Sequence, residues 1–171
     1  MMTKTLVFTL AFAGTVLAAN AALKQFGFVS VGFGLTAPAG VFFAGLGFTL
    51  RDLLHESGGR YWVLAAIAVG GFLSWWIEPT FAIASATAFT VSELVDFSIY
   101  SPLRKRNWLG AVTISNIGGL TVDSVIFLWM AFGSLAFIEG QLAGKAYMTL
   151  AFVIPIYLYR NRNDLPIWRN Q

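Results

Sequence analysis

Residues 61–100 read YWVLAAIAVGGFLSWWIEPTFAIASATAFTVSELVDFSIY, two long apolar runs separated only by Glu78 and Pro79. A helix needs about 20 predominantly apolar residues to cross the hydrocarbon core of a bilayer. The two runs approach that length, and the residue before a proline disfavours helix, so Glu78-Pro79 is typical of a tight turn. The stretch therefore predicts two transmembrane helices joined at the outer face.

The rest of the chain has the same character. Hydrophobic residues make up 57% of the 171 residues and charged residues 11%, whereas soluble domains carry about 25% charged residues. This composition excludes a water-soluble enzyme domain, a coiled coil and a disordered chain. It predicts an all-α, polytopic membrane protein in which residues 1–171 form one domain, a bundle of six transmembrane helices. We expect the spans at about residues 5–23, 38–50, 61–77, 80–100, 109–138 and 142–159.

Two segments near the N-terminus allow more than one interpretation. Ala18-Ala19-Asn20-Ala21 resembles a signal-peptide cleavage site, but apolar character continues past it and five more spans follow, so we expect the first helix to be retained. The glycine- and phenylalanine-rich stretch 26–34 is a candidate N-terminal extension of the second span. Thr36 to Gly40 is typical of a helix start, with Pro38 in the first turn.

Basic residues predict the orientation, because cytoplasmic loops carry an excess of Lys and Arg. With both termini in the cytoplasm, the outer side keeps only Lys24 and Lys145, and Lys145 is expected with Glu139 in a solvated outer loop. The cytoplasmic side then receives Lys4, Arg51, Arg60, Arg104, Lys105, Arg106, Arg160, Arg162 and Arg169. Orientation explains these charges, so nucleic acid is not expected as a partner.

Several kinds of site are missing from the sequence. The chain has no Cys and one His, so it lacks disulfides, thiolate metal sites and a His/Cys metal cluster. It also lacks a phosphate-binding loop ending in Gly-Lys-Ser/Thr. We therefore expect neither an enzyme nor a bound cofactor or metal.

Three acidic residues resist the membrane assignment: Glu93 and Asp96 in the fourth span, and Asp123 in the fifth. One acid at the centre of a span costs about 2.5–3.5 kcal/mol. Helical spacing puts Glu93, Asp96, Tyr100 and Arg104 on one face, and Asn116, Gly119, Asp123 and Phe127 on another. The acids either bond internally, with Arg104 or with neighbouring Ser and Asn residues, or line a polar cavity for a solute.

Other polar residues carry weaker signals. Asn20 is either a hydrogen bond between helices or a ligand contact. Arg51 and Asp52 fit an exposed ion pair at the cytoplasmic interface or a charge-balancing or gating role. His55 is expected to be solvated.

Short blocks of sequence resemble the vitamin uptake transporter-like family, also called the queuosine precursor transporter family. The longest is Lys24 to Gly40, KQFGFVSVGFGLTAPAG, preceded by Ala19-Asn20. The others, in order, are Phe48 to Asp52, Gly59-Arg60, Ser92 to Asp96, Tyr100 to Arg104, Ser115-Asn116 and Val122 to Phe127. Together they span about three quarters of the chain.

The resemblance implies a six-helix importer in a bacterial-type inner membrane, carrying queuosine precursors, which are deazaguanine bases, or a similar vitamin-like solute. We place the solute in a polar cavity between the fourth and fifth spans. A deazaguanine presents ring N–H and amino donors that a carboxylate accepts, a carbonyl that needs a donor, and a flat ring that stacks. The expected roles are Glu93 or Asp123 on the donor edge, Asn116 or Asn20 on the carbonyl, and Phe89, Phe127 or Tyr100 on the ring face. Asp96, Ser92 and Ser124 complete the binding residues, and Arg51, Asp52 and Arg104 balance their charge.

Two other classes remain open. One is a substrate-capturing subunit that depends on a separate energy-coupling module, as S-components do. The other is a non-transport membrane protein, such as a scaffold. A transporter of this kind acts alone or as a homo-oligomer, and both proton coupling and facilitated diffusion fit the sequence.

Overall fold

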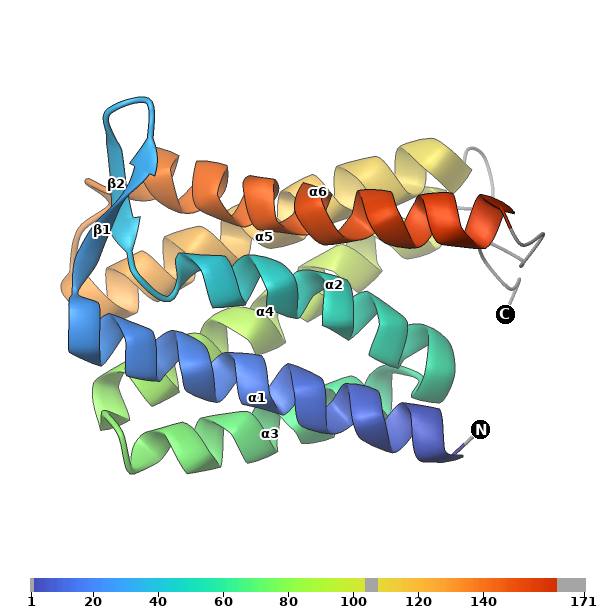
Figure 1. The fold of residues 1–171 in the computed structure, drawn as a ribbon, viewed down its shortest axis with the longest axis horizontal. Coiled ribbons are helices and arrows are strands. Elements are labelled where there is room, and N and C mark those ends of the chain that lie inside the picture. The colour runs from blue at the N-terminus through green and yellow to red at the C-terminus, as the bar shows by residue number, and fades with distance from the viewer. Residues whose placement is uncertain (1, 104–107, 163–171) are drawn as a thin grey trace.

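The computed structural model describes residues 2–103 and 108–162 (Figure 1). Arg104, Lys105, Arg106 and Arg169 lie outside these ranges. Within them the chain is mostly helical and forms, in order, α1 (Met2–Phe26), β1 (Phe28–Gly32), β2 (Leu35–Pro38), α2 (Val41–Gly58), α3 (Arg60–Trp75), α4 (Pro79–Leu103), α5 (Trp108–Phe132) and α6 (Ile138–Arg162).

Each expected span overlaps one of these six helices, but the ends differ. α2 continues to Gly58, well past the expected end at Leu50. α5 stops at Phe132 because Gly133 takes a positive φ of 65°, and α6 begins where we expected the fifth span to finish. By length and composition, three helical segments of the described residues suffice to cross a membrane: Met2–Phe26, Pro79–Tyr100 and Ile114–Phe132. Arg60–Trp75 is apolar but shorter.

The all-α expectation needs one correction, because residues 28–38 form a β-hairpin and do not extend the second span. Phe28 pairs with Pro38 and Ser30 with Thr36 in the antiparallel ladder. Gly32, Phe33 and Gly34 all have positive φ, at 94°, 52° and 74°, a conformation that ends a helix and closes a turn.

The hairpin packs against the start of α6 and the chain before it. The Phe28 ring lies 5.1 Å from that of Phe132 and 4.3 Å from that of Phe137, centroid to centroid. A Cβ on Gly140 would lie 2.1 Å from the carbonyl oxygen of Thr36, so the approach of α6 to β2 requires glycine. This contact fixes the first turns of α6 beside the start of α2.

The helices close into a ring. Neighbour contacts run from α1 to α2, α6, α5, α4 and α3 and back to α1. Successive helices alternate in direction, so α1 begins and α6 ends at one end of the bundle, which we call the terminal end (Figure 1). The hairpin lies at the other, the hairpin end. There Lys24 donates a hydrogen bond to the Ile77 carbonyl and ties α1 to the turn between α3 and α4.

Candidate functional site

A buried ion pair lies inside the ring. Lys145 on α6 is 1% exposed, and its Nζ donates to Oδ2 of Asp123 on α5 and, at 2.8 Å, to Oγ of Ser124. Asp123 is itself 3% exposed. The expectation of Lys145 in a solvated outer loop is therefore wrong. α6 begins at Ile138, seven residues earlier than Lys145, so the lysine lies inside the helix on the face that meets α5.

This pair borders a pocket at the centre of the ring, which we call the central pocket. Its described lining comes from five helices and the residue before α2: Val16, Ala19, Asn20, Gly40, Val41, Ala44, Ser85, Phe89, Asp123, Phe127, Gln141 and Lys145. The space between them is about 380 Å³, including the part open to solvent. The pocket is narrow: the centre of a water molecule can occupy only about 20 Å³ of this space.

Two amide side chains of the lining keep a polar atom unused. Asn20 accepts a 2.8 Å hydrogen bond from Ser85 Oγ through its Oδ1, but its Nδ2 has no hydrogen-bond partner among the described residues. Gln141 Oε1 is also without such a partner there. Both side chains are at most 2% exposed. A buried polar atom without a partner costs about 1–3 kcal/mol, and these two atoms belong to side chains that line the pocket, so they are candidates for contact with a ligand.

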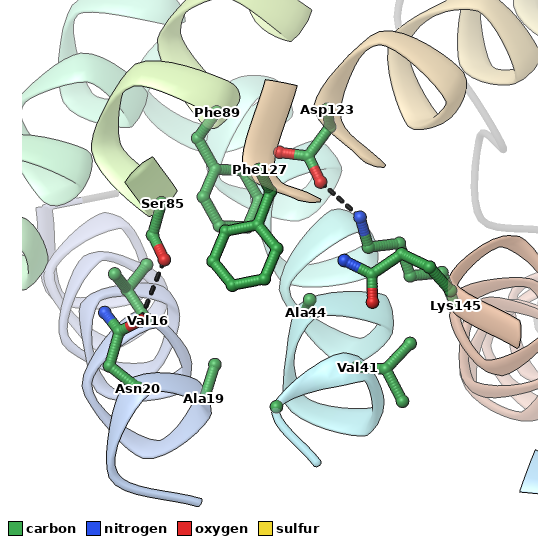
Figure 2. A pocket seen from close by; sticks show the side chains of 12 residues that line it. Val16, Ala19, Asn20, Val41, Ala44, Ser85, Phe89, Asp123, Phe127 and Lys145 are labelled. Carbon is green, nitrogen blue, oxygen red and sulfur yellow. Dashed lines mark hydrogen bonds and ion pairs between the residues drawn. The ribbon is translucent and has the colours of Figure 1, made fainter. Parts of the chain in front are cut away.

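Aromatic rings separate the polar parts of the pocket. Figure 2 shows Phe89 and Phe127 between Asn20 with Ser85 on one side and Asp123 with Lys145 on the other. Phe89 is fixed from behind by edge contact with Phe12, at 5.6 Å between centroids, and by Phe48, at 5.7 Å. The pocket thus combines unused amide groups with flat apolar surfaces.

A second polar group, the Arg51 cluster, consists of Arg51, Asp52, His55, Glu93 and Asn116. Arg51 is 3% exposed and donates to Asp52 Oδ1 from Nε at 3.0 Å and from Nη2 at 2.7 Å. Nη2 also donates to Asn116 Oδ1 at 3.2 Å. Nη1 lies 3.3 Å from Glu93 Oε2, an ion pair that is not aligned as a hydrogen bond. His55 Nδ1 is 3.8 Å from the other Glu93 oxygen.

The Arg51 cluster corrects one interpretation of the sequence. Arg51 is not part of an exposed interfacial pair, because α2 continues for two turns beyond Leu50 and carries the guanidinium inside the bundle. His55, expected in solvent, is only partly exposed and lies beside Glu93.

The two polar groups lie at different levels of the bundle. At 1.5 Å per residue, Ser85 and Glu93 are about 12 Å apart along α4, with the pocket nearer the hairpin end. The Phe48 ring lies between the two cations: its centroid is 5.2 Å from Arg51 Cζ and 6.0 Å from Lys145 Nζ. The buried Phe48 ring therefore contacts both polar groups.

The predicted binding residues divide between these levels. Asn20, Phe89, Asp123 and Phe127 line the central pocket. Arg51, Asp52, Glu93 and Asn116 belong to the Arg51 cluster. Ser124 is buried beside Lys145, and Ser92 is buried with its hydroxyl bonded to the Phe89 carbonyl. Asp96 and Tyr100 are not in the described pocket lining, and Arg104 is outside the described residues.

Three polar residues of the pocket lining were not predicted: Ser85, Gln141 and Lys145. Gln141 and Lys145 are four residues apart and so share one face of a helix, a signal that the sequence carries. Gln141 directly precedes the expected sixth span and Lys145 lies in its first turn. A lysine is ordinary at such a position, so the pair does not stand out in the sequence. Among the described residues no three His, Cys, Asp or Glu side chains are grouped as for a metal ion.

Comparison with known families finds a match over part of the chain. Residues 75–159, which include all of α4 and α5 and most of α6, match the family described as "Putative vitamin uptake transporter". This segment contains the Asp123–Lys145 pair, Glu93 and four further pocket residues. No curated protein and no solved structure matches the chain.

Proposed function

Because residues 75–159 match the vitamin uptake transporter family and the apolar helices indicate an integral membrane protein, we propose that the chain imports a planar, polar-edged solute bound in the central pocket. The solute class we propose is the deazaguanine bases that serve as queuosine precursors. The proposed setting is a bacterial-type inner membrane, crossed six times with both termini in the cytoplasm.

The position of the pocket supports transport. It lies on the axis of a closed ring of helices, and five of the six helices contribute to its lining. A solute at that point touches elements from both halves of the chain, so relative movement of the helices changes its access. The present space is too narrow for a bicyclic base, and binding therefore requires the lining helices to move apart.

The single observation that carries the proposal is the pair of unused amide atoms beside the aromatic rings. Within the described part of the chain, Asn20 Nδ2 is a free donor for a ring carbonyl, and Gln141 Oε1 is a free acceptor for a ring N–H or amino group. Phe89 and Phe127 offer faces for a flat heterocycle (Figure 2). A lactam-bearing base has these three features together, and ligand sites commonly combine apolar walls with a few placed polar groups.

The structure changes the role of the acids within this proposal. Asp123 is already bonded to Lys145, and Glu93 lies in the Arg51 cluster. We therefore assign the first contacts with the solute edge to Asn20 and Gln141. Asp123 remains a second acceptor on the pocket wall. Glu93 is not in the described lining and contributes as a member of the Arg51 cluster.

The test is uptake of a radiolabelled deazaguanine by cells that lack their own transporter. Asn20→Leu and Gln141→Met keep volume and remove hydrogen bonding, and each is expected to lower uptake by about tenfold or more, because a polar ligand edge would lose its buried partner. Glu139→Gln is the matched control, since Glu139 is an exposed acid in the first turn of the same helix as Gln141.

Glu93→Gln and Asp123→Asn extend the test to the acids. Membrane abundance of each variant is measured in parallel, so that loss of protein is separated from loss of transport. Normal uptake by both amide variants, Asn20→Leu and Gln141→Met, would remove the pocket from the proposal. Absence of uptake by the wild type for every deazaguanine would remove the solute class.

A further inference from the structure

The central pocket carries no net charge. Among its described lining residues, Asp123 and Lys145 are the two that titrate, and they are bonded to one another. The remaining lining is apolar or neutral, including Ser85 and the two amides. A solute in the pocket therefore meets one internally balanced ion pair and otherwise uncharged groups.

Lys145 is held firmly in this pair. Its ammonium has two oxygen acceptors, Asp123 Oδ2 and Ser124 Oγ, and lies 6.0 Å from the centroid of the Phe48 ring. The backbone around it is also confined, since a Cβ on Gly45 of α2 would lie 2.7 Å from the Lys145 carbonyl oxygen. The ammonium is thus not a loose group that a solute displaces easily.

This arrangement has a consequence for the solute. A cationic solute would find the Asp123 carboxylate already neutralised, and an anionic solute would find the ammonium already engaged. Either would leave a buried charge without a counter-charge, which is strongly unfavourable away from water. An uncharged solute avoids this cost and bonds to the unused amide atoms.

Resting on the proposed function, we infer that the central pocket selects solutes without net charge, and that Lys145 sets this selectivity by neutralising Asp123. Lys145 is in this sense a specificity-determining residue. Within the deazaguanines, the pocket takes bases with uncharged substituents and rejects those that carry a protonated amine.

The probes are two 7-deazaguanines that differ at one substituent, an uncharged nitrile or an aminomethyl group. An aliphatic amine of this kind, like that of lysine with its pKa of about 10.4, is protonated at pH 7. Competition against labelled nitrile compound is measured in proteoliposomes containing the purified full chain. For the wild type we expect the nitrile compound to compete at least about tenfold better than the aminomethyl compound.

Two variants test the assignment to Lys145. Lys145→Met leaves the Asp123 carboxylate uncompensated, and the preference is expected to reverse towards the aminomethyl compound. The double variant Asp123→Asn/Lys145→Met is the matched control, because its pocket is again neutral. It is expected to keep the wild-type preference for the nitrile compound, even where its total uptake is lower.

The outcomes separate this inference from the proposed function. Uptake of both compounds with equal apparent affinity by the wild type would overturn the charge selectivity and leave the importer intact. Uptake of neither compound would overturn the proposed function. Should Lys145→Met fail to fold, the wild type and the double variant still decide, because preference by either for the aminomethyl compound contradicts the inference.

Discussion

At the scale of single residues, Arg51 is held by groups from three helices. It bonds to Asp52 on its own helix, to Asn116 on α5, and pairs with Glu93 on α4. Guanidinium is the cation best suited to such a position, because its planar fork serves several acceptors at once. Removing one partner of a buried pair leaves the other charge uncompensated, which costs about 3–5 kcal/mol.

We predict that Arg51→Met strongly destabilises the protein and that Glu93→Gln, added to it, restores much of the loss. The reason is that the double variant no longer buries a lone carboxylate at position 93. Thermal unfolding of the purified protein in detergent measures both variants and the coupling between them. If the two single losses simply add in the double variant, Glu93 does not depend on Arg51 for its charge balance.

At this scale the sequence identified the acids but not their partners. Glu93 and Asp123 stand out because carboxylates are rare in apolar helices, and we interpreted them as the contacts of a solute. Their cations, Arg51 and Lys145, come from helix positions near span ends, where a basic residue is ordinary. Sequence gives no distance between helices, so it could not show that each acid meets a cation inside the bundle.

At the scale of elements, neighbouring helices approach closely at glycines, where no side chain keeps them apart. Gly45 on α2 faces α6, and a Cβ there would lie 2.7 Å from both the Lys145 carbonyl oxygen and the Met148 Cβ. Small residues of this kind let transmembrane helices approach closely. The α2–α6 contact also positions Lys145, so packing and pocket depend on the same glycine.

We predict that Gly45→Ala lowers the free energy of unfolding by about 1–3 kcal/mol, because the added methyl group overpacks the contact between α2 and α6. Gly14→Ala is the control. It is also a helical glycine, but a Cβ there meets nothing within 4 Å. Alanine at position 14 is expected to stabilise the helix by about 0.5–1 kcal/mol. Thermal stability in detergent compares the two, and equal effects of both substitutions would contradict the packing argument.

Element prediction succeeded for helices and failed for the hairpin. Long runs of Ala, Leu, Phe and Val identify each helix, although not its ends. The segment Phe28 to Pro38 is just as apolar, so hydropathy alone joined it to the next span. The informative residues are Gly32 and Gly34, which flank Phe33 and allow three successive positive φ values.

At the scale of the whole molecule, the described surface is apolar over many sides of the ring. Large exposed apolar side chains occur on several helices, among them Phe72, Trp129 and Leu158. A monomeric soluble protein rarely exposes so much apolar surface, whereas lipid covers it in a membrane. The ring and its neutral, buried pocket favour a carrier over a scaffold, for which no hollow is needed. A separate energy-coupling partner remains testable as an ATPase that co-purifies with the chain.

The orientation of the bundle gives the last prediction, and the sequence offers a clean background for it because the chain has no Cys. Phe33, at the tip of the hairpin, is 91% exposed, and Tyr61, at the terminal end, is 73% exposed. Lys4, Arg51 and Arg60 lie towards the terminal end, so the excess of basic residues predicts that this end faces the cytoplasm. A membrane-impermeant maleimide added to intact cells is expected to label Phe33→Cys at once and Tyr61→Cys only after the membrane is permeabilised.

Labelling of both from outside would contradict a bundle whose two ends lie on opposite sides of the membrane. The reverse pattern would keep the bundle and invert it, placing the hairpin end, to which the central pocket lies nearer, on the cytoplasmic side.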